Sequence, residues 1–337
     1  MNLNNMEQPL VSVTVITYNS SKTVLETLDS IKAQTYQNLE LIVSDDCSTD
    51  NTVDLCRKWI EQNQDRFVRT VLLTVEKNTG VAGNCNRAGT ACQGEWVKGI
   101  AGDDILMPNC IQDCMDYVAE HPDTEVLFGR VRSFGGKTEE DNRKWDSWFN
   151  YKLLSLPSEE MLHYLLFVAN GLPAPALFSK RGLNEKYDLK NDERIPLLED
   201  WVNWINMLRA GIKFHFLDKD IVLYRLNGGL STGVRSSLKY FESERLFKFY
   251  YAYPAWQQED SDAAIKRIVK EECDIYKQLL EAESEDGCEI HKQRDEYKKL
   301  YERFYREYNQ IAGSKAYRFG KFLLKPISVL KMMLRKK

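Results

Sequence analysis

The chain has 337 residues, and its 46 basic and 50 acidic residues give a formal net charge of −4. The charge is unevenly placed, because residues 313–337 hold eight Lys and Arg and no Asp or Glu, which leaves 38 basic against 50 acidic residues before them. An acidic body with a basic tail argues against a nucleic-acid-binding protein, which needs a basic footprint over its binding surface.

The composition indicates a globular protein, with 43% hydrophobic and 28% charged residues. No apolar run approaches the roughly 20 residues that a membrane-spanning helix needs. Residues 1–9 lack the basic start and apolar stretch of a secretory signal. We therefore expect a cytoplasmic protein in which the eight cysteines are free thiols.

Strands and helices alternate over the first 120 residues. Apolar, β-branched runs predict strands at 10–16, 39–44, 68–75 and 96–100. Helical spacing predicts helices at 21–34, 49–63 and 82–92, and a further one that starts at Pro108. This alternation is typical of an α/β fold with a mainly parallel, open sheet and flanking helices. Ligands of such sheets bind beyond the carboxyl ends of the strands, so the site is expected there.

The pattern is looser beyond residue 120. We expect a strand at 125–132, a Gly-rich, charged loop at 134–150, a helix at 197–210 and one or two strands within 213–224. Residues from about 238 to 311 are highly charged and have helical spacing. We therefore divide the chain into three parts: a main domain at 1–235, a charged helical extension at 236–312 and a basic amphipathic tail at 313–337.

Polar residues, with glycines among them, follow each of the four strands. They are Thr17, Tyr18 and Asn19; Asp45 and Asp46; Asn78 and Gly80; and Gly102, Asp103 and Asp104. Turn formation explains the Asn and Gly residues, but two adjacent carboxylates repel each other unless a cation or solvent screens them. Asp103 and Asp104 therefore predict a Mg²⁺ or Mn²⁺ site that bridges substrate phosphates, because these hard cations prefer carboxylate oxygens.

Four motifs in order resemble one known family, the family 2 nucleotide-sugar glycosyltransferases of bacterial surface-polysaccharide type. They are VSVTVITYN, LELIVSDDCSTDNT, KNTGVAGNCNRA and GEWVKGIAGDDILMP, and the resemblance extends over roughly residues 9–230. It implies the so-called A-type fold, to which the charged helical segment predicted at 236–312 would be a C-terminal extension. It also implies a nucleoside-diphosphate sugar as donor, most often a UDP-sugar.

The resemblance implies roles for the residues at the strand ends. The nucleotide pocket would include Thr17, Tyr18, Asn19, Asp46, Asn78 and Gly80, with the carboxylate of Asp46 on the base. Asp104 would be the direct metal ligand, and Asp103 the second member of that site. For Asp45, a role at the start of a helix is as well supported as a role in binding the nucleotide.

The stretch Leu198-Glu199-Asp200-Trp201 resembles the family's acidic pair ahead of a helix. Asp200 matches the base that takes the proton from the acceptor hydroxyl in an inverting transfer. Glu199 is either a first-turn acid facing the helix dipole or a contact to phosphate or acceptor.

Some positions depart from the family pattern. Asn227 stands where a His is common, and Cys85 stands where many members have Arg, so Asn227 and Arg87 are candidate phosphate or acceptor contacts. The chain also lacks the Q-x-x-R-W motif of processive synthases, which favours transfer of a single sugar to a glycan or lipid-linked acceptor.

The basic tail at 313–337 interleaves Lys and Arg with aromatic and aliphatic residues. This pattern favours contact with anionic lipid at the cytoplasmic face of the inner membrane, although a helix docked on its own domain has the same composition. Two rival functions remain open: a sugar-1-phosphate nucleotidyltransferase, and a catalytically degenerate protein that only binds a nucleotide or a partner as a scaffold.

Overall fold

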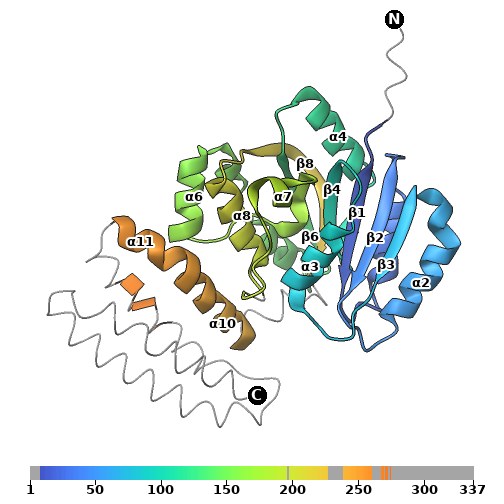
Figure 1. Cartoon of the computed structure of the whole chain (residues 1–337), viewed down its shortest axis with the longest axis horizontal. Helices are drawn as coiled ribbons and strands as arrows, with labels where there is room; N and C mark the ends of the chain where they lie inside the picture. The colour runs from blue at the N-terminus through green and yellow to red at the C-terminus, as the bar shows by residue number, and fades with distance from the viewer. Residues whose placement is uncertain are drawn as a thin grey trace, which may run out of the picture. The chain divides into compact units, whose positions relative to one another are not determined.

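A computed structural model describes residues 8–195, 197–226 and 238–259, together with residues 267–268, 270–271 and 274. The chain divides into two compact units, Met1–Thr232 and Gly233–Lys337. The first unit is an α/β domain (Figure 1). Asn227 and the tail at 313–337 lie outside the described residues, as does most of the predicted extension at 236–312.

An eight-stranded sheet forms the centre of the first unit, in the order β3-β2-β1-β4-β7-β6-β8-β5. Its strands are β1 (Val11–Thr17), β2 (Leu39–Asp45), β3 (Arg69–Leu73), β4 (Trp96–Ala101), β5 (Ile105–Leu106), β6 (Val126–Phe134), β7 (Leu177–Lys180) and β8 (Phe214–Arg225). The pairs β1–β2, β2–β3, β1–β4 and β6–β8 are parallel, and β4–β7, β6–β7 and β5–β8 are antiparallel. The predicted mainly parallel, open sheet is confirmed.

Helices of the first unit flank this sheet (Figure 1). They are α1 (Val24–Lys32), α2 (Thr52–Asn63), α3 (Gly80–Thr90), α4 (Cys110–Glu120), α5 (Glu139–Asp146), α6 (Ser158–Phe167), α7 (Leu183–Tyr187) and α8 (Glu199–Arg209). Short 3₁₀ turns add η1 (Gln64–Arg66), η2 (Tyr151–Ser155) and η3 (Ala174–Ala176).

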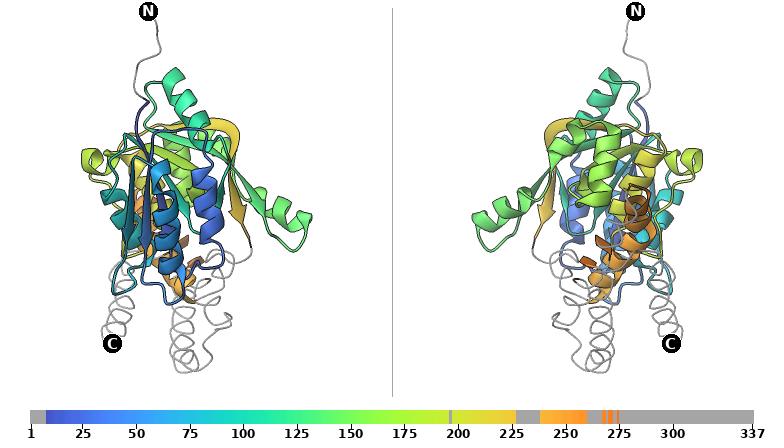
Figure 2. Two further views of the ribbon diagram at one scale, coloured as in Figure 1. Left: turned by 90° about the vertical axis from the view of Figure 1, so that its right-hand side faces the viewer. Right: turned by 90° about the vertical axis from the view of Figure 1, so that its left-hand side faces the viewer.

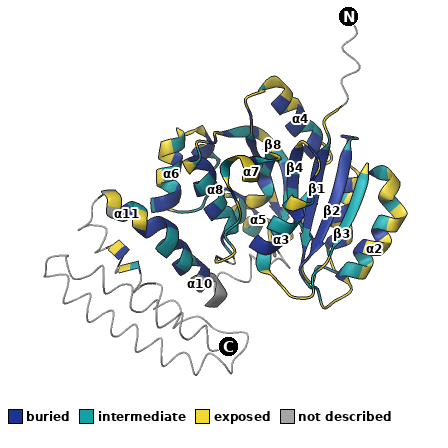
Figure 3. Ribbon diagram, in the orientation of Figure 1, coloured by how far each residue is buried: buried dark blue, intermediate teal, exposed yellow. Residues whose placement is uncertain are grey.

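The central strands are apolar along most of their length because layers cover both faces of the sheet. Every residue of β2 is buried, and all but one of β1, as the dark ribbons of Figure 3 show. The helices bury one stripe each: in α1 the buried apolar side chains are Val24, Leu28 and Ile31, spaced three and four apart. This packing holds the carboxyl ends of β1, β2 and β4 in fixed register.

A buried carboxylate joins the opposite ends of these strands. Glu40 of β2 is fully buried and accepts hydrogen bonds from Ser12 Oγ, from the amide of Gly94 at 2.9 Å and from Arg69 Nη1 at 2.8 Å. Burial alone would raise its pKa, but the hydrogen bonds outweigh burial and hold the pKa below the ordinary value. Glu40 is therefore ionised and bonded in the folded protein.

The structure corrects two predictions made from the sequence. The stretch 134–150 is not a loop throughout, because it contains α5, which begins with a capping box formed by Thr138 and Asp141. Figure 2 shows α5 projecting from the body of the first unit beside β8. The helix expected to start at Pro108 begins at Cys110 instead, so the proline precedes the helix.

The described part of the second unit is helical, with α10 (Leu238–Phe247), the π-helical turn η4 (Lys248–Ala252) and α11 (Tyr253–Glu259). Lys248 Nζ pairs there with Glu244 at 2.9 Å and Glu271 at 2.7 Å. Among the described residues, no helix has the length and apolar character needed to span a membrane. The predicted boundary between the extension and the tail falls outside these residues.

We expect Glu40→Gln to lower the free energy of unfolding by about 2 kcal/mol near neutral pH, because its amide group cannot accept all the donors that surround it. The stabilisation from ionised Glu40 is present above its unfolded pKa of about 4.3 and is lost as the pH falls through the lower folded pKa. Urea unfolding at several pH values measures it, with exposed Glu61→Gln as control. If the variant and the unaltered protein differed in free energy of unfolding by the same amount at neutral and at strongly acidic pH, this account would be contradicted.

Candidate functional site

The carboxyl ends of β1, β2 and β4 meet at one edge of the sheet. The side chain of Thr17 donates to Asp45 Oδ2 at 2.8 Å, and the amide of Gly102 donates to the carbonyl of Ile16 at 2.9 Å. A Cβ on Gly102 would lie 2.8 Å from Thr17 Cγ2, so only glycine allows this approach. The predicted residues of the three loops are thereby brought together.

The loop after β1 is fastened to the loop after β2. The amide of Asn19 donates to Ser48 Oγ at 2.8 Å, and Asn19 Oδ1 accepts the amide of Thr49 at 2.8 Å. Asn19 has a φ of 51°, a left-handed conformation that Asn tolerates better than most residues. Thr17 is 2% exposed and Tyr18 is 39% exposed, so Tyr18 presents a larger surface to a ligand at this edge.

Asp46 caps the N-terminus of α3 across the site. Its carboxylate accepts the amides of Thr79 at 3.0 Å and Gly80 at 2.8 Å, and the hydroxyl of Thr79 at 2.6 Å. Asn78 supports the same turn, since its side-chain amide donates to the carbonyl of Asp46 at 3.0 Å. Gly80 has a φ of 80° with open space around its Cβ direction, so conformation rather than crowding favours glycine. Asp46 therefore has a structural role, and its contact with the base stays a prediction.

Arg87 of α3 points into this group of loops. Its guanidinium donates to Ser44 Oγ at 2.9 Å, to Asn84 Oδ1 at 2.8 Å and to Asp46 Oδ1 at 3.1 Å. Its side chain is 20% exposed. Arg87 thus supplies positive charge at the strand ends, next to the predicted nucleotide pocket.

The acid pair follows β4 directly and is held by the end of β8. The amide of Arg225 donates to Asp104 Oδ1 at 2.9 Å, and Arg225 Nε donates to the carbonyl of Asp103 at 2.7 Å. The Arg225 guanidinium also pairs with Glu26 of α1 and lies 4.5 Å from the ring centre of Phe134. Arg225 therefore fixes the position of Asp103 and Asp104.

Burial raises the pKa of Asp103 and Asp104, and the negative charge of Asp103 raises the pKa of Asp104 further. Lys98 and Arg225 offset part of this repulsion. Two adjacent, desolvated carboxylates whose mutual repulsion is only partly offset fit a divalent cation. Within the described residues no third Asp, Glu, His or Cys completes a metal-binding cluster, so the diphosphate and water would have to supply the other ligands.

The second acid pair lies in the first turn of α8. Burial and the charge of Asp200 raise the pKa of Glu199 to about 8. Asp200 Oδ1 accepts the amide of Trp201 at 2.7 Å, and Asp200 Oδ2 accepts Asn170 Nδ2 at 3.0 Å. Glu199 is therefore neutral near pH 7. Asp200 is the candidate for the charged member of the pair.

Cys85 lies within the electrostatic reach of Glu199 and Asp200 of α8 and of Asp46 in the loop after β2. Burial raises the pKa of its thiol, and the charges of Glu199, Asp200 and Asp46 act on it as well. The thiol is therefore uncharged, and it brings no positive charge to a position where many family members have Arg. Arg87, two residues along α3, is the cation whose contacts the structure describes there.

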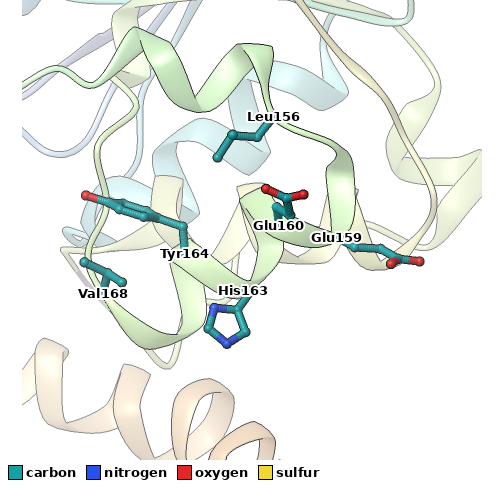
Figure 4. A pocket seen from close by; sticks show the side chains of 6 residues that line it. All are labelled: Leu156, Glu159, Glu160, His163, Tyr164 and Val168. Atoms are coloured by element: carbon teal, nitrogen blue, oxygen red, sulfur yellow. The ribbon is translucent and has the colours of Figure 1, made fainter.

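A separate pocket of about 420 Å³ lies along α6 (Figure 4). It is lined by Leu156, Glu159, Glu160, His163, Tyr164 and Val168. None of the site residues predicted from the sequence contributes to it, so we do not assign the chemistry to this pocket.

Sequence reasoning missed three residues: Asn170 and Arg225, which contact the predicted acids, and Glu26, which pairs with Arg225. Glu26 reads as an ordinary exposed helix residue, and Asn170 precedes Gly171 in what reads as a turn. Arg225 lies two positions before Asn227, where the family commonly has a His. Asn227 itself lies outside the described residues.

Comparison with known proteins identifies the family. The family model "Glycosyl transferase family 2" matches residues 12–180. The chain is 34% identical to the glycosyltransferase GlyG of Streptococcus pneumoniae serotype 4 over 125 residues, which are 37% of this chain and 40% of GlyG. It is 25% identical over 220 residues to WfaP of Escherichia coli, named a UDP-Glc:alpha-D-GlcNAc-diphosphoundecaprenol beta-1,3-glucosyltransferase, covering 65% of this chain and 78% of WfaP.

The fold is shared with a solved structure. TarS residues 1–349 of S. aureus, in complex with UDP-GlcNAc, superpose with a TM-score of 0.55 at 19% identity, covering 89% of this chain and 73% of that one. At this identity the likeness supports the fold alone. The family model spans half of the chain, and the chain therefore belongs to family 2 of the glycosyltransferases.

Proposed function

We propose that this protein transfers a single sugar, with inversion, from a nucleoside-diphosphate sugar to an acceptor hydroxyl in cell-surface polysaccharide biosynthesis. The observation that carries the proposal is the pair of desolvated carboxylates, Asp103 and Asp104, which follows β4 at the edge where β1 and β2 also end. Such a site suits the metal-screened diphosphate of an activated sugar.

The loops after β1 and β2 support the nucleotide end of the donor. Tyr18 offers an exposed side chain and Asn19 shapes the turn after β1, while Asn78 and Gly80 shape the turn after β3. Asp46 would contact the base, and Arg87, which donates to Asp46 Oδ1 at 3.1 Å, would offer its guanidinium to phosphate. A UDP-sugar is the favoured donor, since the name of WfaP specifies UDP-Glc and TarS was crystallised with UDP-GlcNAc.

Asp104 and Asp103 would hold a Mg²⁺ or Mn²⁺ ion, which would screen the charge of the departing diphosphate. Arg225 fixes the acid pair from the end of β8 through its backbone amide and its guanidinium. Asp200 takes the proton of the acceptor hydroxyl as that oxygen attacks the anomeric carbon from the face opposite the diphosphate. Glu199 stays protonated near neutral pH, so it adds no second negative charge beside the base.

The acceptor is proposed to be a glycan carried on a polyprenyl diphosphate at the membrane surface. WfaP, by its name, acts on such a lipid-linked acceptor. The basic residues at 313–337 would bring the protein to anionic lipid, where that acceptor is concentrated.

The donor assignment is tested by thermal shift with UDP, UDP-glucose, UDP-GlcNAc and other nucleoside-diphosphate sugars, each with and without Mn²⁺ or Mg²⁺. We expect at least one nucleotide to raise the Tm in a metal-dependent way, because a ligand that binds only the folded state stabilises it by mass action. If no nucleotide raises the Tm with either metal, the donor proposal fails.

The same screen supplies the donor for a turnover assay in which release of the nucleoside diphosphate is measured. Asp200→Asn should keep nucleotide binding but lower kcat by at least a hundredfold, since the base is removed. If this variant turns over as fast as the unaltered protein, Asp200 is not the base. Release of inorganic diphosphate from a nucleoside triphosphate and a sugar 1-phosphate would instead support the rival nucleotidyltransferase.

For the acid pair we expect two effects of opposite sign from Asp104→Asn. Without metal the Tm should rise, because a buried, repelled carboxylate is replaced by a neutral group. With Mn²⁺ and UDP the stabilisation seen in the unaltered protein should disappear. The control is Asp113→Asn. Asp113 lies on α4 and its carboxylate pairs with Lys219 of β8, so this variant should leave the Mn²⁺ and UDP effect intact. An undiminished Mn²⁺ effect in Asp104→Asn would remove this residue from the metal site.

The membrane proposal predicts that a chain ending at residue 312 no longer sediments with vesicles that contain anionic lipid. The full chain should sediment with these vesicles and be released by high salt, because the contact is partly electrostatic. Neutral vesicles are the control. Equal sedimentation of the full and shortened chains would reject the tail as the membrane contact.

A further inference from the structure

The carboxylate of Asp200 is held by a side chain from another segment. Asn170 follows α6 and lies 30 positions before Asp200, and its Nδ2 donates to Asp200 Oδ2 at 3.0 Å. The other end of the same amide is fixed, because Asn170 Oδ1 accepts the backbone amide of Leu172 at 3.2 Å. The acceptor role of Oδ1 defines which way the amide faces and turns its NH₂ group toward Asp200.

The segment that carries Asn170 is fastened on two sides. Trp201 Nε1 donates to the carbonyl of Leu165 at 2.8 Å, which joins α8 to α6. The carbonyl of Gly171 accepts the amide of Asn150 at 2.8 Å. A Cβ on Gly171 would lie 3.0 Å from Asn150 Cβ, so glycine permits this close approach. The position of Asn170 as a donor is therefore fixed by the contacts of the segment on both sides of it.

We propose that Asn170 is a positioning residue for the transfer: its amide fixes the orientation of the Asp200 carboxylate and favours its charged form. This inference rests on the proposed function, in which Asp200 is the base. A hydrogen bond to an ionised carboxylate is stronger than one between neutral groups, and it stabilises that ionised form. Asn170 has no ionisable proton, so it can donate to the base without protonating it.

The charged surroundings of Asp200 make such a donor useful. Glu199 precedes it on α8, and the thiol of Cys85 on α3 lies within the electrostatic reach of both acids. Neither group brings positive charge, because one is an acid and the other an uncharged thiol. An amide donor next to them supports the ionised state of Asp200 with no added charge that would repel or attract the substrate.

The test compares Asn170→Ala and Asn170→Ser with the unaltered protein, using nucleoside diphosphate release from the UDP-sugar that the thermal-shift screen identifies. We expect Asn170→Ala to lower kcat/KM about tenfold near neutral pH, the loss typical of one hydrogen bond to a charged group. The acid limb of the pH profile should shift to higher pH, since the ionised base has lost a donor. Asn170→Ser keeps a hydroxyl donor and should recover part of both effects.

Asn142→Ala is the matched control. Asn142 is buried, whereas Asn170 is half-buried, and Asn142 Oδ1 accepts the amide of Gly136 at 2.9 Å; it lies on α5, and its described hydrogen bonds involve neither acid pair. It should change the Tm without moving the pH profile. UDP binding, followed by thermal shift, should be unchanged in all variants.

The outcomes separate this inference from the function beneath it. If Asp200→Asn abolishes turnover while both Asn170 variants keep the pH profile of the unaltered protein, the positioning role is wrong and the proposed function stands. A loss of rate in Asn170→Ala with no shift of the acid limb also overturns it, since that is the result of a structural role alone. If the Asp200→Asn variant keeps the normal rate of turnover, Asp200 is not the base, and the inference about Asn170 fails together with that assignment.

Discussion

Asp103 and Asp104 are adjacent carboxylates just beyond the end of β4, and their mutual repulsion has to be offset by the groups around them. Part of the compensation comes from Lys98 within β4, whose Nζ donates to the carbonyl of Gly99 at 2.9 Å. Another part comes from Arg225, which reaches the pair because β8 pairs with both β5 and β6. The remaining unfavourable charge is what makes the pair suitable for a divalent cation.

The acids of this edge differ in function because their surroundings differ. Asp45 and Asp46 accept hydrogen bonds from hydroxyl groups and backbone amides, and these bonds connect the loops after β1, β2 and β3. For Glu199, burial and the charge of Asp200 outweigh a hydrogen bond from its own backbone and raise the pKa to about 8. Neighbouring carboxyl groups of different acidity can serve as a neutral neighbour and a charged base.

The sequence predicted the first four strands and the helices between them because their apolar spacing is local and regular. It did not predict β5 and β7, which are short and exist through antiparallel pairing with β8, β4 and β6. The helix α5 was also missed, since its charged residues and the preceding glycines resemble a loop. Its capping box, Thr138 with Asp141, was the local signal available.

The family, and the positions of Asp104 and Asp200 relative to its motifs, followed from the sequence by itself, because each motif is a short run of neighbouring residues at the end of a strand or the start of a helix. The tertiary structure decided which side chains hold these acids. Glu26, Asn170 and Arg225 lie far from their partners along the chain, and only the packing of helices and strands brings their donors and charges into contact. Hydrogen bonds act over about 3 Å, so contacts between distant segments leave no pattern in the spacing of residues.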